Sequence, residues 1–207
     1  MGFMGRLPAV LGTDHLPLAE LCAARLDGEL FAIDDGWAPV DEPDLPAFRA
    51  AALALRAPRS LIVERASAAW VHGAIDVPPA IAQFCVPSSA RIAVLADRRS
   101  TVREVRIEDD EIVRLGDVRC TSVVRTGFDL LRDPDLDDDL AVEVTTALFD
   151  ARRALLGELR DRLEGAFRMP YRSAALARLG RVELRLRLVD ARQVPGDAQT
   201  GQPSLTR

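Results

Sequence analysis

The sequence has no lysine and no asparagine, and it contains little histidine, tyrosine or cysteine. Codons for lysine and asparagine are AT-rich, whereas codons for alanine, arginine, aspartate, glycine and proline are mostly GC-rich. The bias therefore indicates a GC-rich bacterial genome. Because arginine supplies every basic side chain for that reason, its abundance is weak evidence for phosphate binding, although the guanidinium group suits that task.

The scarcity of histidine excludes the commonest catalytic arrangements. Each of the two histidines, His15 and His72, would need a nearby nucleophile and an acid to form a triad. Ser67 precedes His72 on one expected helix at a spacing that points the two side chains to different faces, and no G-x-S-x-G elbow is present. The chain also lacks a P-loop and a G-x-G-x-x-G motif. We therefore predict a protein that is not an enzyme and carries no cofactor.

The few cysteines form no C-x-x-C pair, so neither a disulfide framework nor a zinc site is indicated. They are Cys22, Cys85 and Cys120. We expect three reduced and mostly buried thiols. The acidic run 137–139 is better explained as the solvated start of a helix than as a set of metal ligands, and we predict no metal site.

Long apolar runs are absent as well. No run approaches the roughly 20 residues that cross a bilayer, and glycine and proline interrupt the first twelve residues too often for a signal peptide. We therefore expect a cytoplasmic protein with no membrane contact. Of the 207 residues, 48% are apolar and 29% are charged, which is typical of a globular domain rather than of a disordered chain.

Charge is distributed unevenly along the chain. Residues 1–46 hold two arginines and nine acidic residues, a net charge of −7. Residues 151–207 hold twelve arginines and six acidic residues, a net charge of +6. The N-terminal part should therefore repel nucleic acid, and the C-terminal part should attract it.

Helical spacing and turn residues divide the chain into three parts. Apolar residues predict a helix over 17–26, and a turn at Asp34–Gly36 joins two short strands after it. The polar segment 41–46, DEPDLP, is the expected domain boundary. We predict an α+β fold with a winged-helix remnant over 1–44, a mixed α/β domain with a small sheet and a C-terminal helical hairpin over 45–190, and a disordered tail over 191–207.

Local patterns predict the elements of the second part. Gly116 and Asp117 predict a hairpin turn, and Gly157 is expected to divide a long helix that starts at the acidic run. The sequence leaves open whether 171–189 is a helix or a strand. The expected helices cover 47–55, 60–72, 123–132 and both sides of Gly157, and the expected strands cover 81–86, 92–95, 101–107 and 111–121.

Two local patterns are the most informative. In SAAWVHGA, Ser67–Ala74, small residues allow close helix packing and Trp70 offers a large apolar anchor. In CTSVVRTGFDLL, Cys120–Leu131, a strand ends at residues that cap the next helix, and Arg125 and Asp129 stand four apart and can pair on its surface. Residue by residue, both patterns are explained by core packing and capping.

In this order the patterns resemble the AbiEi-type (abortive infection, type IV toxin–antitoxin) antitoxins of actinobacteria. That family has a "SAAWxHG" helix, a run of strands, a "VTSxxRTxxDL" segment, a helical hairpin and a short basic stretch, here YRSAALARLG. The resemblance covers roughly residues 16–180. The matching positions, which we expect to be structural, are Ser67, Trp70, His72, Gly73, Thr121, Arg125, Thr126 and Asp129.

The resemblance implies a non-enzymatic transcriptional regulator. In the family, a winged helix binds inverted repeats in the protein's own promoter DNA, and the C-terminal domain opposes a nucleotidyltransferase-like toxin. This sequence departs from the pattern at its front, because only one clear helix precedes an acidic ribbon, so we expect a shortened winged helix. If the chain binds DNA, the basic part should supply the contacts. The candidates are Arg152, Arg153, Arg168, Arg172 and Arg178.

Two alternatives remain open. The chain could be a protein-interaction module of the same fold that contacts its partner through the acidic front and does not bind DNA. It could also be a nuclease-related protein, since Glu183 and Arg185 stand in an order that resembles a metal-dependent nuclease motif. Alternating Val182, Leu184, Leu186 and Leu188 instead explain that run as a strand face, with the charged residues between them solvated.

Overall fold

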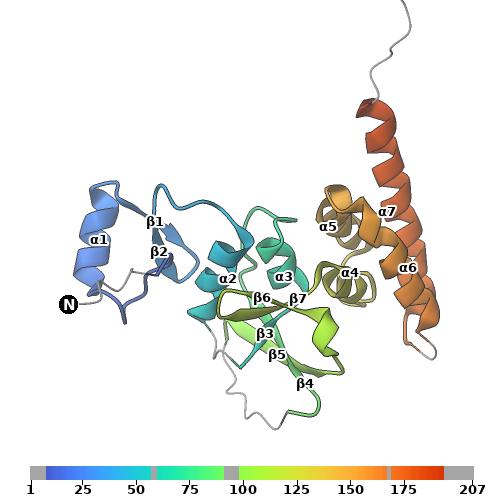
Figure 1. Cartoon of the computed structure of the whole chain (residues 1–207), viewed down its shortest axis with the longest axis horizontal. Helices are drawn as coiled ribbons and strands as arrows, with labels where there is room; N and C mark the ends of the chain where they lie inside the picture. The colour runs from blue at the N-terminus through green and yellow to red at the C-terminus, as the bar shows by residue number, and fades with distance from the viewer. Residues whose placement is uncertain (1–7, 57–59, 91–97, 167–168, 194–207) are drawn as a thin grey trace, which may run out of the picture.

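The structure is a computed structural model that describes residues 8–56, 60–90, 98–166 and 169–193. Three parts follow one another along the long axis: an N-terminal helix with a ribbon, a central sheet with two helices, and a C-terminal group of helices (Figure 1). Helices and strands do not alternate as repeated β-α units, and the predicted α+β class is confirmed.

The N-terminal part is a short helix followed by a two-stranded antiparallel ribbon. Gly28, with φ of 78°, ends the helix, and Asp34, with φ of 52°, turns the chain between the strands. The order of helix, ribbon and turn is as predicted. Its identity as a winged-helix remnant stays a prediction. The elements are α1 (Leu18–Leu26), β1 (Leu30–Ile33) and β2 (Gly36–Pro39).

The central sheet has five strands in the order β5-β4-β3-β7-β6. β3 runs parallel to β7, β4 runs parallel to β5, and the β3–β4 and β6–β7 pairs are antiparallel. Gly116, with φ of 61°, makes the predicted hairpin turn. The strands are β3 (Ile62–Val63), β4 (Ala82–Pro87), β5 (Ser100–Val105), β6 (Ile112–Leu115) and β7 (Val118–Thr121), and the 3-10 turn η1 (Asp109–Glu111) precedes β6.

The expected helix over 60–72 is wrong in its first half. Ile62 and Val63 form β3, and the helix begins only after Glu64. Both strand residues are fully or almost fully buried and pair with β4 on one side and β7 on the other, so pairing with distant strands overrides local helix propensity. The two helices here are α2 (Pro46–Ala54) and α3 (Arg65–Val71). The strand expected over 92–95 lies outside the described residues.

The C-terminal part begins as the acidic run predicts. Oδ1 of Asp137 accepts hydrogen bonds from the backbone N–H groups of Asp139 and Leu140, at 3.0 and 3.1 Å, and thereby caps α5. The break in the long helical stretch falls at Ala151, and Gly157 lies in the first turn of the next helix, so its predicted role as the divider is wrong. The elements are α4 (Val123–Leu131), α5 (Asp138–Asp150), the 3-10 turn η2 (Arg153–Leu155) and α6 (Leu156–Gly165).

The last element settles the choice that the sequence left open. Residues 172–193 form one helix, α7 (Arg172–Gln193), which continues past residue 190, where we placed the end of the folded part. The strand-face interpretation of Val182 to Leu188 is therefore wrong. Val182 and Leu186 are buried, whereas Leu184 and Leu188 are exposed on the opposite side of the helix. The rest of the expected tail lies outside the described residues.

The apolar side chains form two cores that meet at α3. The first lies among the N-terminal part, the sheet, α2 and α3 and includes Ala38, Trp70 and Phe84. The second lies among the C-terminal helices and includes Ala69 of α3 and Phe149. α3 therefore contributes to both cores and joins the sheet to the helices. Among the described helices, none combines the length and the apolarity that a bilayer span requires.

Candidate functional site

The two segments that carry the family resemblance meet in the interior of the molecule. Nε2 of His72, at the end of α3, lies 2.8 Å from the backbone oxygen of Thr121, at the end of β7. The hydroxyl groups of Thr121 and Thr126 are 2.7 Å apart. All three side chains are buried. This contact fixes the end of α3 against the junction of β7 and α4.

Trp70 is 2% exposed, which confirms its predicted burial. Arg49 of α2 lies over its ring, with 5.5 Å from guanidinium carbon to ring centroid, and donates to the Trp70 backbone oxygen at 2.8 Å. Oγ of Ser67 accepts from the backbone N–H of Gln83 at 2.9 Å. Gly73 ends the region with φ of 81°, where a side chain would be strained. Each of these motif positions thus has a packing or hydrogen-bonding role.

Arg125 and Asp129 form the expected ion pair, with 2.7 Å between Nε and Oδ2. The predicted surface location is wrong, because the two side chains are only 4% and 3% exposed. Nη1 of Arg125 also donates to the Glu111 carboxylate at 2.7 Å and to the Arg106 backbone oxygen at 3.0 Å. A buried ion pair needs such additional hydrogen bonds to offset its desolvation. The network therefore holds α4 against η1 and the end of β5.

Three arginines surround the ring of Phe128. The guanidinium carbons of Arg162, Arg132 and Arg125 lie 4.8, 5.1 and 5.9 Å from its centroid. Burial lowers the pKa of Arg132, and the nearby positive charge of Arg125 adds to that effect. Sequence reasoning missed this cluster, because Arg162 comes from α6 and only the packing of α6 on α4 brings it to the ring.

Burial also determines the chemistry of other titratable groups. Burial raises the pKa of Glu64, although its carboxylate accepts two hydrogen bonds from Arg103 at 2.5 and 2.6 Å. Burial lowers the pKa of His72. Burial raises the pKa of the thiols of Cys85 and Cys120, so both stay protonated and unreactive. All three cysteines are unbonded, and Cys22, unlike the other two, is exposed.

The arginines that sequence reasoning assigned to DNA are used inside the molecule. Arg152 donates to the backbone oxygens of Leu148 and His72 at 3.1 Å each. Arg172 donates to backbone oxygens at the end of α6. Arg153 donates to the Leu186 backbone oxygen and pairs with Asp150 and Asp190. Arg168 lies outside the described residues.

Of these arginines, Arg178 makes the most hydrogen bonds inside the molecule. Its five N–H donors are all engaged, with backbone oxygens of Leu131, Asp133 and Leu136 and with the carboxylate of Asp138, at 2.5 to 3.0 Å. The residue is 6% exposed. It therefore holds the loop between α4 and α5 in place. This geometry does not favour contact between Arg178 and DNA phosphate.

The exposed arginines lie elsewhere, along the outer side of α7. Buried Ala175, Leu179, Val182 and Leu186 recur at helical spacing on its inner side. That spacing was the signal that could have identified a helix and located its outer face. The arginines exposed on α7 are Arg181, Arg185, Arg187 and Arg192.

The nuclease alternative finds no support in the position of Glu183. Its carboxylate is paired with Arg160 of α6, and Nη2 of Arg160 lies 2.6 Å from each oxygen. Within the described ranges, no group of three or more histidine, cysteine, aspartate or glutamate side chains is placed to hold a metal ion. As expected from sequence, Asp137 and its neighbours serve as the start of a helix.

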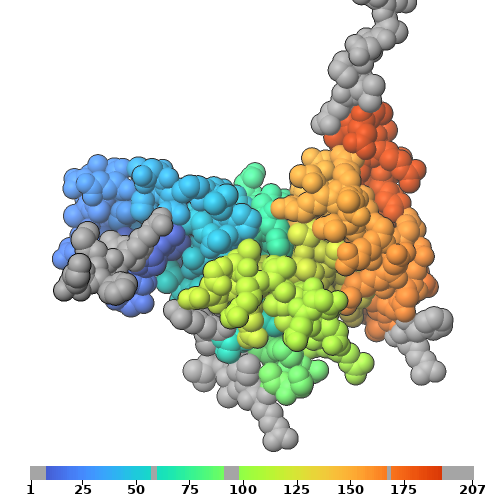
Figure 2. Space-filling model, viewed as in Figure 1, coloured from blue at the N-terminus to red at the C-terminus, as the bar shows by residue number. Residues whose placement is uncertain are grey.

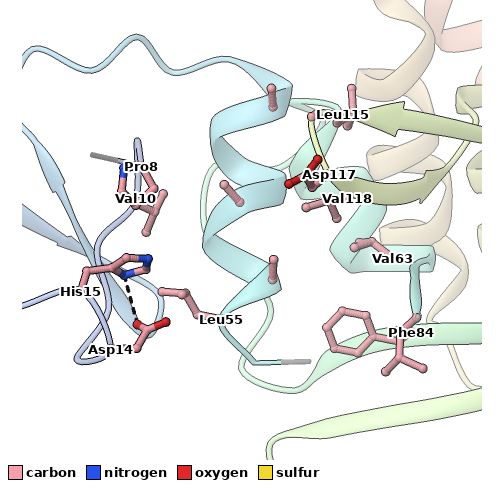
Figure 3. Close-up of a pocket in the computed structure, with 15 residues that line it drawn as sticks. Pro8, Val10, Asp14, His15, Leu55, Val63, Phe84, Leu115, Asp117 and Val118 are labelled. Atoms are coloured by element: carbon pink, nitrogen blue, oxygen red, sulfur yellow. Dashed lines mark ion pairs between the residues drawn. The ribbon is translucent and has the colours of Figure 1, made fainter. Parts of the chain in front are cut away.

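A cleft of about 370 Å³ lies where the N-terminal part meets α2 and the β6–β7 hairpin. Figure 3 shows Val10 and His15 on one side of α2 and Leu115 and Val118 on the other. The cleft is lined mostly by apolar side chains. The lining residues are Pro8, Val10, Asp14, His15, Ala47, Ala51, Ala54, Leu55, Leu61, Val63, Phe84, Leu115, Gly116, Asp117 and Val118.

Small residues keep this cleft open. Ala47, Ala51 and Ala54 share one face of α2, three to four residues apart, and all three line the cleft. Gly36 permits the close approach of the ribbon, since a Cβ there would lie 2.6 Å from side-chain atoms of Leu55 and Val10. A larger side chain on α2 would therefore fill space that the fold leaves empty.

An ion-pair network beside the cleft fixes the N-terminal part. Arg56, just after α2, pairs with Asp34 and Asp35 in the turn of the ribbon, and Arg99 also pairs with Asp35. The Asp34 side chain is 1% exposed. Burial raises its pKa, and the Arg56 charge opposes that shift. These ion pairs hold the turn of the ribbon against the end of α2, next to Leu55 in the lining of the cleft.

Carboxylates stand at the rim. Asp14 is exposed, and its Oδ1 approaches Nδ1 of His15 at 3.0 Å. The same nitrogen of His15 accepts a hydrogen bond from the backbone N–H of Gly12 at 2.9 Å. Asp117 is exposed at the hairpin turn. An apolar floor with an acidic rim suits an apolar anchor flanked by basic groups.

Comparisons with known proteins supply no function for the chain, so the functional argument depends on the geometry described above. No protein-family model matches the chain, and a search of curated proteins finds no match.

Proposed function

We propose that the chain is an antitoxin-like regulator that acts by binding a protein, and that this partner is a nucleotidyltransferase-like toxin. The resemblance to AbiEi-type antitoxins supplies the class of partner. The polar residues of the shared motifs favour a binding protein over an enzyme. Arg125, Asp129 and His72 are buried and already hydrogen-bonded within the fold. Their role is to build the scaffold.

The cleft between the N-terminal part and α2 carries the proposal. Its volume of about 370 Å³ lies in the range typical of binding sites, roughly 300–1,000 Å³, and such sites favour boundaries between structural units. Interfaces are usually dominated by a few large side chains that fill pockets on the partner. We infer that an apolar side chain of the toxin enters the cleft, and that a basic group beside it meets Asp14.

The geometry favours promoter DNA less than it favours a protein partner. Phosphate contacts usually dominate affinity for DNA, and they need accessible basic side chains. Arg178 is buried, and Arg152 and Arg172 are hydrogen-bonded to helix ends. The exposed residues of the N-terminal part include Glu20 and Asp27, which repel phosphate. We therefore favour the protein-binding form of the antitoxin over the promoter-binding form.

Growth rescue tests the proposal. The proposal predicts that a neighbouring gene encodes a nucleotidyltransferase-like toxin, and this protein is to be expressed in a bacterial host at a level that arrests growth. Co-expression of the wild-type chain should restore growth, and Ala51→Trp should not, because the indole fills the cleft. Ala174→Trp, at an exposed site on α7, is the matched control and should restore growth. Full rescue by Ala51→Trp would exclude the cleft, and no rescue by the wild type would exclude this toxin as the partner.

A further inference from the structure

Three arginine side chains gather where the start of α3 meets the end of α4. Arg65 is the first residue of α3, and its Nη1 lies 3.0 Å from Oδ2 of Asp133, just after α4. Arg132, which ends α4, precedes Asp133 in the chain. Arg103 of β5 reaches the same junction, because its guanidinium pairs with the carboxylate of Glu64, the neighbour of Arg65. Three cations from three elements therefore lie close together.

This junction lies in the middle of the molecule. Figure 1 shows α3 and α4 side by side, and Figure 2 shows their part of the chain between the blue N-terminal part and the orange helices α6 and α7. Arg65, Arg103 and Arg132 do not line the cleft beside α2. The arginine group is therefore a separate feature of the fold.

The carboxylates of the junction are each matched by an arginine, and one arginine is left over. The three matched pairs are Glu64 with Arg103, Asp129 with Arg125, and Asp133 with Arg65. Among the described residues, Arg132 forms no ion pair and donates no hydrogen bond, although a guanidinium has five N–H donors. Its guanidinium carbon lies 5.1 Å from the ring centroid of Phe128. The ring holds the guanidinium in place and leaves its donors available.

The unmatched charge of Arg132 is unfavourable where it stands. Burial lowers the pKa of Arg132; the charge of Asp129 opposes that shift, and the charges of Arg125, Arg103 and Arg65 add to it. The side chain is only partly exposed, so water compensates its charge incompletely. A cation held among other cations favours an anion from outside the chain.

The two neighbouring arginines also keep donors for such an anion. Nε of Arg65 is buried and has no hydrogen-bond partner in the part of the chain that the structure describes. Buried donors without a partner are rare in folded proteins, and a water or an ion often completes them. Arg65 has a φ of 47°, a costly conformation for a residue with a side chain, and such conformations gather at functional sites. Arg103 bonds Glu64 through Nε and Nη2, which leaves Nη1 available.

We propose that Arg132, Arg65 and Arg103 form a binding site for a phosphate group. A phosphate presents oxygens in several directions, and guanidinium groups donate to such oxygens in pairs. Near neutral pH it carries about two negative charges, more than a carboxylate brings. It therefore suits donors that approach from three elements. This inference does not depend on the proposed function.

The recessed position favours a single phosphate group over the backbone of DNA. The side chains of Arg65 and Arg103 are only 20% and 34% exposed, and the buried carboxylates of Glu64 and Asp133 lie among them. Affinity for DNA grows with the number of phosphates that accessible basic side chains contact. The carboxylates here would repel a row of phosphates. The ligand is therefore inorganic phosphate or the phosphate of a small ester.

Calorimetric titration tests the site, near neutral pH and at constant ionic strength with chloride as the balancing anion. The wild-type chain should bind one phosphate group. Arg132→Gln should weaken that binding by at least about tenfold, because an amide has neither the charge nor the paired donors of a guanidinium. Arg114→Gln, at an exposed position on β6, is the matched control and should bind like the wild type.

Three probes distinguish the two sources of the phosphate group: inorganic phosphate, adenosine monophosphate and adenosine. Equal affinity for the first two would show that inorganic phosphate is sufficient, and tighter binding of the monophosphate would identify an ester. Both outcomes support the site, provided that adenosine does not bind. The proposal would be overturned if neither phosphate compound bound, if adenosine bound as tightly as its monophosphate, or if Arg132→Gln bound like the wild type.

Thermal melting separates a binding role of Arg132 from a purely structural one. Without phosphate, Arg132→Gln should melt at the wild-type temperature or above it, because the substitution removes a cation that other cations repel. The bound phosphate compound should raise the melting temperature of the wild type and leave that of the variant unchanged, since a ligand of the folded form stabilises it. A variant that melts below the wild type without phosphate would contradict the proposal, and so would an equal rise in both chains.

Discussion

The ring of His72 and the backbone oxygen of Thr121 are joined across 49 positions of sequence by one buried contact of 2.8 Å. A carbonyl oxygen only accepts, so Nε2 of His72 carries the proton and the ring is the Nε2–H tautomer. The backbone oxygen of His72 in turn accepts from Arg152 at 3.1 Å. Three segments that lie apart in the sequence therefore meet at this one residue.

Stability should fall with acidity in a way that depends on His72. Burial lowers its pKa below the ordinary value of 6.5, so the unfolded chain takes the proton first. The stabilisation that comes from neutral His72 is full above pH 6.5. As the pH falls below 6.5, the free energy of unfolding decreases by up to about 1.4 kcal/mol per pH unit, until His72 is protonated in the folded form as well. Urea unfolding at several pH values should show a smaller loss in His72→Gln. Equal losses in the variant and the wild type would contradict this assignment.

Replacing Trp70 by alanine should lower the free energy of unfolding by about 3–5 kcal/mol, as large core truncations do. The ring is 2% exposed, packs in the first core, and lies under Arg49. Denaturant unfolding measures the change. Val77→Ala, at a side chain that is 72% exposed, is the control and should stay near wild type. An unchanged midpoint for Trp70→Ala would show that α3 is misplaced.

The arginines of the basic part should separate into two kinds. Arg178→Ala should destabilise the fold by about 2–4 kcal/mol, because it leaves three backbone carbonyls and Asp138 without their donor. Arg185→Ala should change stability by less than about 0.5 kcal/mol. In mobility shifts at several salt concentrations, any attraction to DNA should depend on Arg185. A salt slope that falls for Arg178→Ala alone would restore the original assignment.

The purified chain should cleave neither DNA nor RNA with Mg²⁺ or Mn²⁺, and it should transfer no nucleotide. Glu183 is held by Arg160 between two helices, where it supports packing. Glu183→Ala should therefore change the melting temperature slightly and nothing else. Cleavage that requires metal and disappears in Glu183→Ala would show that the chain is a nuclease.

Elements with strong local signals could be predicted from sequence. Asp137 caps α5, Gly116 turns the hairpin, and Asp34 turns the ribbon, because each depends on residues close together in the chain. The burial of Trp70 could also be predicted from local sequence, because a large apolar ring next to small residues is favoured in a packed core.

Features that depend on distant contacts could not be predicted. Ile62 and Val63 form a strand only because β4 and β7 lie on either side of them. Arg178 was assigned to DNA phosphate because no local pattern shows that it lies next to the end of α4 and the loop after it, where it donates to backbone oxygens. The cleft likewise needs the N-terminal part to pack beside α2, through Arg56 and the ribbon turn.

Calorimetric titration of the purified chain with the proposed partner, a nucleotidyltransferase-like toxin that we expect a neighbouring gene to encode, tests the central claim most directly. The wild type should form a complex in which one toxin binds each chain, and Ala51→Trp should bind at least about tenfold more weakly while its melting temperature stays near wild type. If Ala51→Trp fails to fold, Ala47→Trp, at an exposed position of the same cleft, replaces it. Ala174→Trp should bind like the wild type. Absence of a complex, or equal affinity for Ala51→Trp and the wild type, would contradict the claim.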